Sequence, residues 1–335
     1  MDFNFFTVLE KDNKELIHSS FMRFLLGEDS RFAEKFLGIE AFGPQKVISL
    51  EKSYLLDIRG KNRRCRLDIE IVDGQRIIII ENKFKSFPDT AQLAHYDQVL
   101  DCQHPGKHQV KFLLCFDKNL FAGHGDWIVK DYSDLSIYLA EYLDGMDNGD
   151  KKLFITHYYS FLKDYLQKYE TYLKSSSCIF LNQSENENKF WLRLLYSHLK
   201  IRLDRYFAEK GMTVGIGFGN GNASIPLMDI VPEHWILNDQ RLLLQVQNGE
   251  LKFYGLTKDK VFLNEIIAFS RSVINNVEFK KMTSRKENTA FIFKLNIHNP
   301  LQQGQDFNLD YIYEIVIRFL EIIEERIIVP YLLKS

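Results

Sequence analysis

The sequence contains few cysteines and no closely spaced cysteine pair. The four cysteines, Cys65, Cys102, Cys115 and Cys178, are scattered through 335 residues without a Cys-x-x-Cys motif. Structural zinc sites usually carry such pairs, so no zinc site is expected. Isolated cysteines are typical of free, buried thiols in a reducing compartment, and the expected location is the cytoplasm.

Long apolar segments are also missing from the sequence. No run approaches the ~18–20 residues that are needed to cross a lipid bilayer. The first residues, MDFNFFTVLEKDN, lack the basic start and the cleavage site of a signal peptide. The sequence therefore predicts no membrane segment and no interaction with a membrane.

Neither sign of charge is in strong excess. The chain has 43 Lys and Arg against 45 Asp and Glu, which gives a formal net charge of -2. No global field would draw it to nucleic acid, so nucleic-acid binding would need a local basic surface. With 45% hydrophobic and 26% charged residues the composition is globular, and the length suits two domains.

A β-hairpin is predicted around Asp73-Gly74. Two runs rich in β-branched residues flank this dipeptide, and Asp-Gly between such runs is a strong hairpin signal because both residues tolerate a positive φ. A two-residue loop at this point would pair Val72 with Gln75. Counting outward then sets Asp68 opposite Ile79.

This register brings charged side chains together on one face of the hairpin. Side chains alternate along a strand, so Asp68, Glu81 and Lys83 share a face, with Asp68 and Glu81 as diagonal neighbours. Such neighbours lie about 7–8 Å apart at the backbone, and one metal ion fits between two carboxylates there. The opposite face would pair Leu67 with Ile80 in a core. A strand that simply ends in solvent is an equal alternative for the hairpin alone.

A helix predicted over Thr90–Leu100 carries Gln92 and Tyr96 on one face. The order Asp68, then Glu81-Asn82-Lys83, then Gln92-x-x-x-Tyr96 resembles the PD-(D/E)xK nuclease superfamily. The last pair is similar to the QxxxY motif of its RecB-like and lambda-exonuclease-like branch.

The start of the chain extends this resemblance over roughly the first half of the sequence. The stretch Glu15-Leu-Ile-His18-Ser19 is similar to a Glu-x-x-His-Ser helix in a bacterial family of uncharacterised PD-(D/E)xK proteins. Leu67 stands where the family name has proline, a position at which the superfamily often lacks it.

The resemblance implies an α/β fold, a restriction-endonuclease-like mixed sheet flanked by helices, and a metal-dependent nuclease. Carboxylates and a main-chain carbonyl would bind Mg²⁺ or Mn²⁺, which prefer oxygen ligands. Lys83 would orient the attacking water, and a glutamate of the first helix would reach the metal or its water. The candidate catalytic residues are Asp68, Glu81, Lys83, Gln92, Tyr96 and Glu15, and the candidate metal ligands are Asp68, Glu81 and the carbonyl of Asn82.

The favoured partner is nucleic acid, with DNA preferred. A basic segment, 59–66, precedes Asp68 and would contact phosphates, although a solvated turn is an equal alternative. The candidate nucleic-acid-binding residues are Arg64, Arg66 and Lys85. DNA against RNA, endonuclease against exonuclease, and a protein partner or homo-oligomer stay open.

Glu51 and Glu70 are further acids near the predicted site, and each is favoured as an ordinary strand residue over a metal ligand. The polar stretch 175–186 predicts a boundary between a nuclease-like domain, 1–175, and a C-terminal α+β domain, 187–335, of unknown role. The glycines of 215–221 lack a GK[ST] ending, which favours a turn or bulged strand over a phosphate loop. The alternative to a nuclease is a nucleic-acid-binding or protein-interaction module without turnover.

Overall fold

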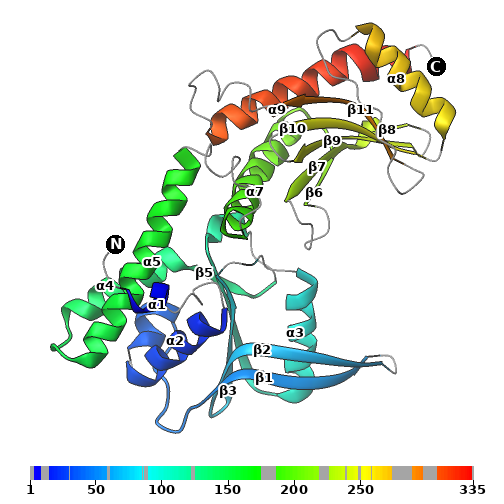
Figure 1. The fold of residues 1–335 in the computed structure, drawn as a ribbon. Helices are drawn as coiled ribbons and strands as arrows, with labels where there is room; N and C mark the ends of the chain where they lie inside the picture. Colours follow the sequence, from blue (N-terminus) through cyan, green and yellow to red (C-terminus); the bar gives the residue numbers. More distant parts are fainter. Residues whose placement is uncertain are drawn as a thin grey trace. The chain divides into compact units, whose positions relative to one another are not determined.

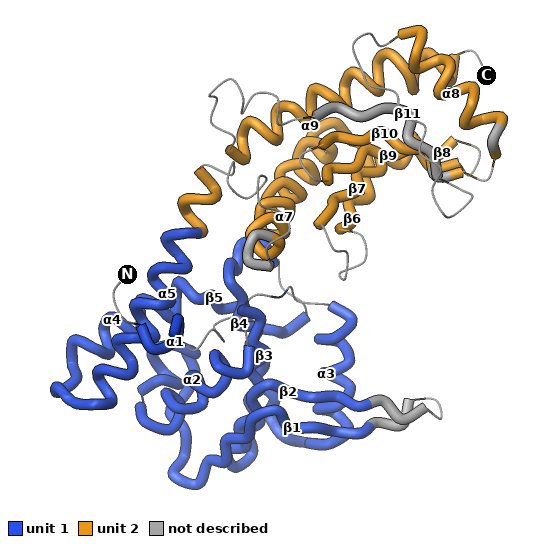
Figure 2. Tube along the Cα trace, in the orientation of Figure 1, with its two compact units in different colours: residues 1–168 blue, residues 169–335 orange. Residues whose placement is uncertain are grey.

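The computed structural model divides the chain into two compact units, Met1–Lys168 and Tyr169–Ser335 (Figure 2). The predicted boundary falls on a segment that is mostly outside the described residues, and it stays a prediction. The structure describes residues 4–8, 15–29, 31–58, 61–84, 86, 90–121, 125–174, 186–218, 226–237, 240–247, 250–257, 259–273, 289–296 and 308–333.

Unit 1 is built on a five-stranded mixed sheet whose strands lie in sequence order (Figure 1). The first three strands are antiparallel, and the third, fourth and fifth are parallel. A parallel neighbour requires a crossover, and helix α3 (Thr90–Gln103) supplies it between β3 and β4. The strands are β1 (Val47–Ile58), β2 (Lys61–Asp73), β3 (Arg76–Lys83), β4 (His108–Cys115) and β5 (Ile128–Asp131).

Helices flank this sheet in the order that the sequence predicts. Helix α4 follows β5 directly and begins at a capping box, in which the Asp131 and Asp134 side chains accept from each other's main-chain N–H groups. The resulting α-β-β-β-α-β order confirms the predicted restriction-endonuclease-like fold class. The other helices are α1 (Phe5–Val8), α2 (Glu15–Glu28), a π-helix (Ala33–Leu37), α4 (Tyr132–Asp144) and α5 (Asp150–Lys174).

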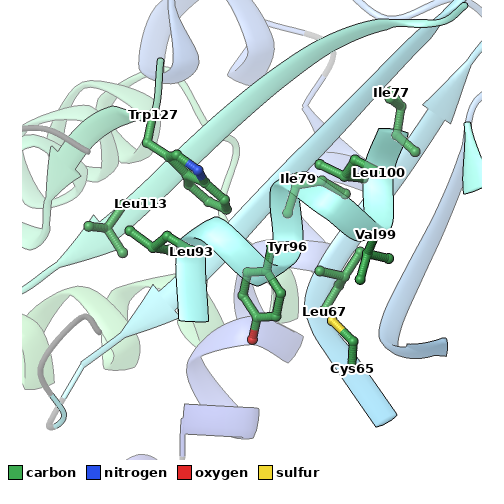
Figure 3. Packing of buried hydrophobic residues seen from close by; sticks show 10 residues of the cluster. All are labelled: Cys65, Leu67, Ile77, Ile79, Leu93, Tyr96, Val99, Leu100, Leu113 and Trp127. Carbon is green, nitrogen blue, oxygen red and sulfur yellow. The ribbon is translucent and has the colours of Figure 1, made fainter. Parts of the chain in front are cut away.

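The core of unit 1 lies on both faces of β3. Residues 77–80 are all isoleucines, and none is more than 1% exposed. Helix α3 packs Leu93 and Val99 in one cluster with Ile77 and Ile79 (Figure 3). Helix α2 contacts the same strands from the other side of the sheet (Figure 1). A strand covered on both faces is apolar throughout, which explains the run of isoleucines.

The predicted hairpin exists, but its predicted register is wrong by two residues. The ladder closes at Asp73 with Arg76, so the loop is Gly74-Gln75 rather than Asp73-Gly74. Gly74 has a φ of 59°, which suits glycine. Asp73 stays in the strand because its carboxylate accepts from the Gly43 N–H at 3.1 Å and pairs with the Arg76 guanidinium.

The shift brings the two acids to matching positions just beyond the last pair of the ladder, instead of diagonal positions within it. The last pair of the ladder is Ile69 with Ile80, and the next residues outward are Asp68 and Glu81. Ile79 pairs with Glu70, not with Asp68 as predicted. A shift by two residues does not by itself move side chains to the other face, so the predicted clustering of the acids does not depend on the error.

Strand β1 is irregular opposite Asp68. Glu51 has a φ of 49°, and its neighbours pair regularly, Leu50 with Ile69 and Lys52 with Leu67. A positive φ is uncommon outside glycine and redirects the strand. Leu67, on β2, packs in the α3 cluster with Ile77 and Ile79 (Figure 3), so its predicted pairing with Ile80 on the opposite face is wrong.

Unit 2 is an α+β unit, as predicted, with an antiparallel sheet in the order β11-β10-β9-β7-β6 and β8 beside β9. Gly215 and Gly217 lie in β6, whereas Gly219 and Gly221 are outside the described residues. The strands are β6 (Val214–Gly217), β7 (Leu227–Pro232), β8 (Ile236–Leu237), β9 (Gln240–Gln247), β10 (Glu250–Leu256) and β11 (Thr289–Asn296). The helices are α7 (Asn186–Glu209), α8 (Lys260–Val273), α9 (Leu309–Ile323), a π-helix (Glu324–Ile328) and α10 (Val329–Leu332).

Two of the cysteines are free and buried, as expected, at Cys65 and Cys115. Cys102, in the last turn of α3, is free but exposed, and Cys178 is outside the described residues. In the described part of the chain, no helix combines the length and the apolar character that crossing a membrane requires.

Candidate active site

Charged and polar side chains replace the isoleucines at the end of β3. Glu81, Asn82 and Lys83 are 1%, 0% and 8% exposed, so the strand carries them into the interior rather than into solvent. Buried charges are costly unless they are paired or bind an ion. The predicted alternative of ordinary surface charges is therefore wrong for these positions.

The Glu81 carboxylate is only half satisfied. Its Oε1 accepts from Lys83 Nζ at 2.7 Å and lies 3.2 Å from the Tyr96 hydroxyl. Its Oε2 is buried and has no hydrogen-bond partner among the residues that the structure describes. Burial raises the pKa of Glu81, the nearby Asp68 charge adds to this effect and Lys83 offsets part of it, so that the pKa is about 7. The site thus holds an acid that is poised near neutrality.

Asp68 reaches the same strand end from β2. Its Oδ2 accepts from the Asn82 main-chain N–H at 2.8 Å. Burial raises the pKa of Asp68, although the hydrogen bond from Asn82 and the charge of Lys83 oppose this effect. A buried and a half-buried carboxylate, each with a raised pKa, are therefore brought together with one lysine.

Lys83 keeps its charge in this setting. Burial lowers the pKa of Lys83, but the Glu81 carboxylate, with smaller contributions from Glu15 and Asp68, raises it by more. A buried ammonium that is held protonated by carboxylates can be directed at an anionic substrate.

Helix α2 closes the site from the N-terminal side. The Ser86 hydroxyl donates to Oε1 of Glu15, and the main-chain carbonyl of Glu15 accepts from Asn82 Nδ2 at 3.1 Å. The predicted first-helix glutamate therefore lies beside the end of β3, with its carboxylate close enough to influence Asp68 and Lys83.

The Asn82 side chain is a structural anchor. Its Nδ2 also donates to Ser19 Oγ at 3.1 Å, and its Oδ1 accepts from the Tyr132 hydroxyl at 2.5 Å. These bonds join α2, β3 and α4, so a ligand role for Asn82 can rest only on its main-chain carbonyl. Ser19 belongs to the Glu-x-x-His-Ser stretch, but nothing in the sequence singles out Tyr132.

His18 is also part of this support. It is fully buried, stacks on Phe84 with ring centroids 3.8 Å apart, and its Nδ1 lies 2.8 Å from the Tyr158 hydroxyl. The ring is enclosed in an aromatic core, which suits the prediction that it bonds locally and is not a catalytic base.

Gln92 and Tyr96, the predicted residue pair on α3, are hydrogen-bonded to each other, and Tyr96 also contacts Glu81. Gln92 Nε2 donates to the Tyr96 hydroxyl, which lies 3.0 Å from the Arg66 carbonyl and 3.2 Å from Glu81 Oε1. The single tyrosine proton is shared between these two acceptors. Tyr96 therefore fixes Glu81 relative to β2, and Gln92 fixes Tyr96.

The candidate basic residues lie on β2, just before Asp68. Arg66 is exposed and pairs with Glu51 at 3.3 Å, and Arg64 donates to Ser53 Oγ at 3.2 Å. Lys85 lies outside the described residues. The Glu51 carboxylate is therefore ion-paired with the Arg66 guanidinium.

Glu70 is separate from this group. It is 2% exposed, the Tyr54 hydroxyl donates to its Oε2, and His104 Nε2 lies 3.5 Å from the same oxygen.

The donor set fits a hydrated divalent cation. In the described part of the chain, no three His, Cys, Asp or Glu side chains are placed together to hold a metal. Mg²⁺, however, usually keeps several waters and takes only one or two protein carboxylates. The oxygens of Asp68 and Glu81, with the unpartnered Oε2, meet that requirement.

Residues 3–160 match the family model described as the PD-(D/E)XK nuclease superfamily. The match confirms the resemblance stated from the motifs, and it falls within unit 1. No curated protein and no solved structure matches the chain.

Proposed function

We propose that unit 1 hydrolyses phosphodiester bonds in nucleic acid, with DNA as the favoured substrate and Mg²⁺ or Mn²⁺ as the cofactor. The observation that carries the proposal is the pair formed by the buried Glu81 and the half-buried Asp68, with one oxygen of Glu81 unpartnered among the described residues beside a charged Lys83. A buried acid next to a second carboxylate is destabilising unless positive charge offsets the pair. The family match of residues 3–160 supports the same reaction class.

The carboxylates of Asp68 and Glu81 and the main-chain carbonyl of Asn82 would hold the cation. A bound divalent ion supplies Lewis acidity, which offsets charge on the phosphate and lowers the pKa of a coordinated water. The Asn82 side chain contributes indirectly, because its bonds to Ser19 and Tyr132 hold the end of β3 in place.

The remaining side chains would act on the substrate and the attacking water. Lys83 Nζ, held 2.7 Å from Glu81 Oε1, would stabilise the negative charge that builds up on the phosphate in the transition state. Glu15 would orient the water from α2. Gln92 and Tyr96 would keep Glu81 in its ligating orientation, and the exposed Arg64 and Arg66, with Lys85, would contact flanking phosphates.

The test is cleavage of labelled single-stranded, double-stranded and circular DNA in Mg²⁺, Mn²⁺ or EDTA. Wild type should cleave only with a metal, and Lys83→Ala should lose about 10²–10³-fold in rate. Lys35→Ala removes an exposed lysine from the π-helix and serves as the matched control.

Undiminished cleavage by Lys83→Ala would contradict the proposed mechanism. No cleavage of any substrate by wild type, together with no Mn²⁺ binding, would favour the alternative of a binding module without turnover.

A further inference from the structure

The last residues of β3 lie beyond the ladder with β2. That ladder ends at Ile69 with Ile80, whereas the pairing of β3 with β4 continues to Lys83. The Asn82 main-chain N–H donates instead to Asp68 Oδ2 at 2.8 Å. The N–H and the carbonyl of a strand residue point to the same neighbouring strand, so the Asn82 carbonyl also faces the β2 side, where Asp68 lies. The orientation of this one residue therefore governs two proposed ligands, its own carbonyl and the Asp68 carboxylate.

The Asn82 side chain is completely buried and is held from two sides. Its Nδ2 donates to the main-chain carbonyl of Glu15 and to Ser19 Oγ, each at 3.1 Å, and its Oδ1 accepts from the Tyr132 hydroxyl at 2.5 Å. A carbonyl can only accept, so the atom that faces Glu15 is the amide nitrogen and the amide oxygen faces Tyr132. Without the Tyr132 hydroxyl, a buried amide oxygen would lose this donor, which is destabilising.

Tyr132 is itself fixed in the core of unit 1. It is the first residue of α4 and follows the capping-box residue Asp131. Its ring is completely buried and lies edge-to-face on Phe84, with the centroids 4.7 Å apart and the planes at 80°. Its hydroxyl is also hydrogen-bonded with Tyr158 of α5, whose own hydroxyl lies 2.8 Å from His18 Nδ1 on α2. Packing and hydrogen bonding thus fix the Tyr132 hydroxyl relative to α2, α4 and α5.

We propose that Tyr132, supported by Tyr158, is a positioning residue that sets the affinity of unit 1 for its divalent cation. The proposal rests on the proposed nuclease function and names, for the same site, a residue that acts without touching the cation. Tyr132 acts through Asn82, whose carbonyl would bind the ion and whose N–H holds the Asp68 carboxylate. Partners that orient the ligands of a metal ion typically change its affinity by about 10–100-fold when they are removed.

The test is a calorimetric Mn²⁺ titration of the full chain without nucleic acid, at a pH above the Glu81 pKa of about 7. The test variant is Tyr132→Phe, which removes only the hydroxyl. The matched control is Tyr138→Phe on the same helix, because Tyr138 is 6% exposed and its hydroxyl donates to the buried carboxylate of Asp29. Each substitution removes a donor from a buried acceptor, so urea unfolding should show a loss of stability in both variants.

The affinities for Mn²⁺ should separate the two variants. Tyr132→Phe should bind Mn²⁺ about tenfold or more weakly than wild type, whereas Tyr138→Phe should stay within about twofold of wild type. Asn82→Ala should also bind Mn²⁺ more weakly than wild type. Adding Tyr132→Phe to Asn82→Ala should cause no further loss of affinity, because both substitutions break the same contact. A role in stability alone would lower the urea midpoint without producing this pattern of affinities.

Equal Mn²⁺ affinity in Tyr132→Phe and wild type would overturn the proposal. So would an equal loss in Tyr138→Phe, which would assign the effect to general destabilisation, or a further loss when Tyr132→Phe is added to Asn82→Ala. If Tyr132→Phe does not fold, Asn82→Ala decides the outcome, because Tyr132 must act through this side chain. Unchanged Mn²⁺ affinity in Asn82→Ala would then overturn the proposal.

The positioning role and the nuclease function can fail separately. The expected order of Mn²⁺ affinities without cleavage of any substrate would contradict only the nuclease function. Metal-dependent cleavage that is lost in Lys83→Ala, together with unchanged Mn²⁺ affinity in Tyr132→Phe, would contradict only the positioning role. A wild type that binds no Mn²⁺ would contradict both.

Discussion

Glu70 and Glu81 are buried glutamates on neighbouring strands of one sheet, and their surroundings differ. Glu70 is 2% exposed, receives a hydrogen bond from Tyr54 and has His104 Nε2 at 3.5 Å. Glu81 is 1% exposed, keeps Oε2 without a partner in the described part of the chain, and has a pKa raised by burial and by Asp68 to about 7. Burial alone therefore does not mark a functional acid.

The difference lies in what surrounds each carboxylate. A tyrosine donor and a nearby histidine satisfy Glu70 with groups that need no ion, as expected of a structural contact. A second acid beside Glu81 and an oxygen without a donor leave a local excess of negative charge that a cation can offset. Glu81 therefore differs from Glu70 in two features: one of its carboxylate oxygens has no donor among the described residues, and a second carboxylate lies beside it.

The largest effect should be on catalysis. Glu81→Gln should reduce the metal-dependent cleavage rate by about 10³-fold, because it removes a metal ligand charge. Glu70→Gln, the matched substitution on the next strand, should leave the rate within about one order of magnitude of wild type. Initial rates on a labelled DNA duplex measure both, and equal losses would remove the distinction between the two acids.

A smaller effect concerns pH. Metal binding needs the deprotonated Glu81 carboxylate, whose pKa is raised to about 7, chiefly by burial and by the Asp68 charge. Mn²⁺ affinity should therefore be full above this pKa and should weaken as the pH falls through it, by about tenfold per pH unit when one proton is displaced. Calorimetric titrations with Mn²⁺ at several pH values, from about 8 down to about 5, measure how the affinity changes with pH.

The Glu70→Gln protein should keep this pH slope, and the Glu81→Gln protein should lose it. A slope that survives in Glu81→Gln would assign the titration to another group.

The smallest effect concerns stability in the Glu70 region. Tyr54→Phe removes a donor from a buried carboxylate and should lower the free energy of unfolding by about 1–3 kcal/mol, with little change in cleavage rate. Tyr159→Phe, at a half-buried tyrosine on α5, is the control and should stay within about 0.5 kcal/mol of wild type. Urea unfolding measures the free energy of unfolding of both variants. An unchanged value for Tyr54→Phe would mean that another group satisfies the Glu70 carboxylate.

The clustering of Asp68, Glu81 and Lys83 could be predicted from the sequence because strand alternation tolerates an error of two residues. The register could not, since Asp73 is held in the strand by Gly43 and Arg76, and Gly43 lies far away in the sequence.

Strand alternation in the sequence also could not predict the side on which Leu67 packs. The β1–β2 pair is irregular at this point, where Glu51 has a positive φ, and no motif indicates that irregularity. The anchoring of Asn82 by Tyr132 joins residues 50 positions apart, and only the tertiary fold brings them together. Local periodicity therefore predicts the acids, whereas their support comes from long-range contacts.

The most direct test is a calorimetric Mn²⁺ titration of wild type, Glu81→Gln and Glu70→Gln at a pH above 7. The account predicts that wild type and Glu70→Gln bind Mn²⁺ with similar affinity and that Glu81→Gln binds it at least about tenfold more weakly. Equal affinity in Glu81→Gln and wild type would contradict the assignment of the β3 end as the metal site.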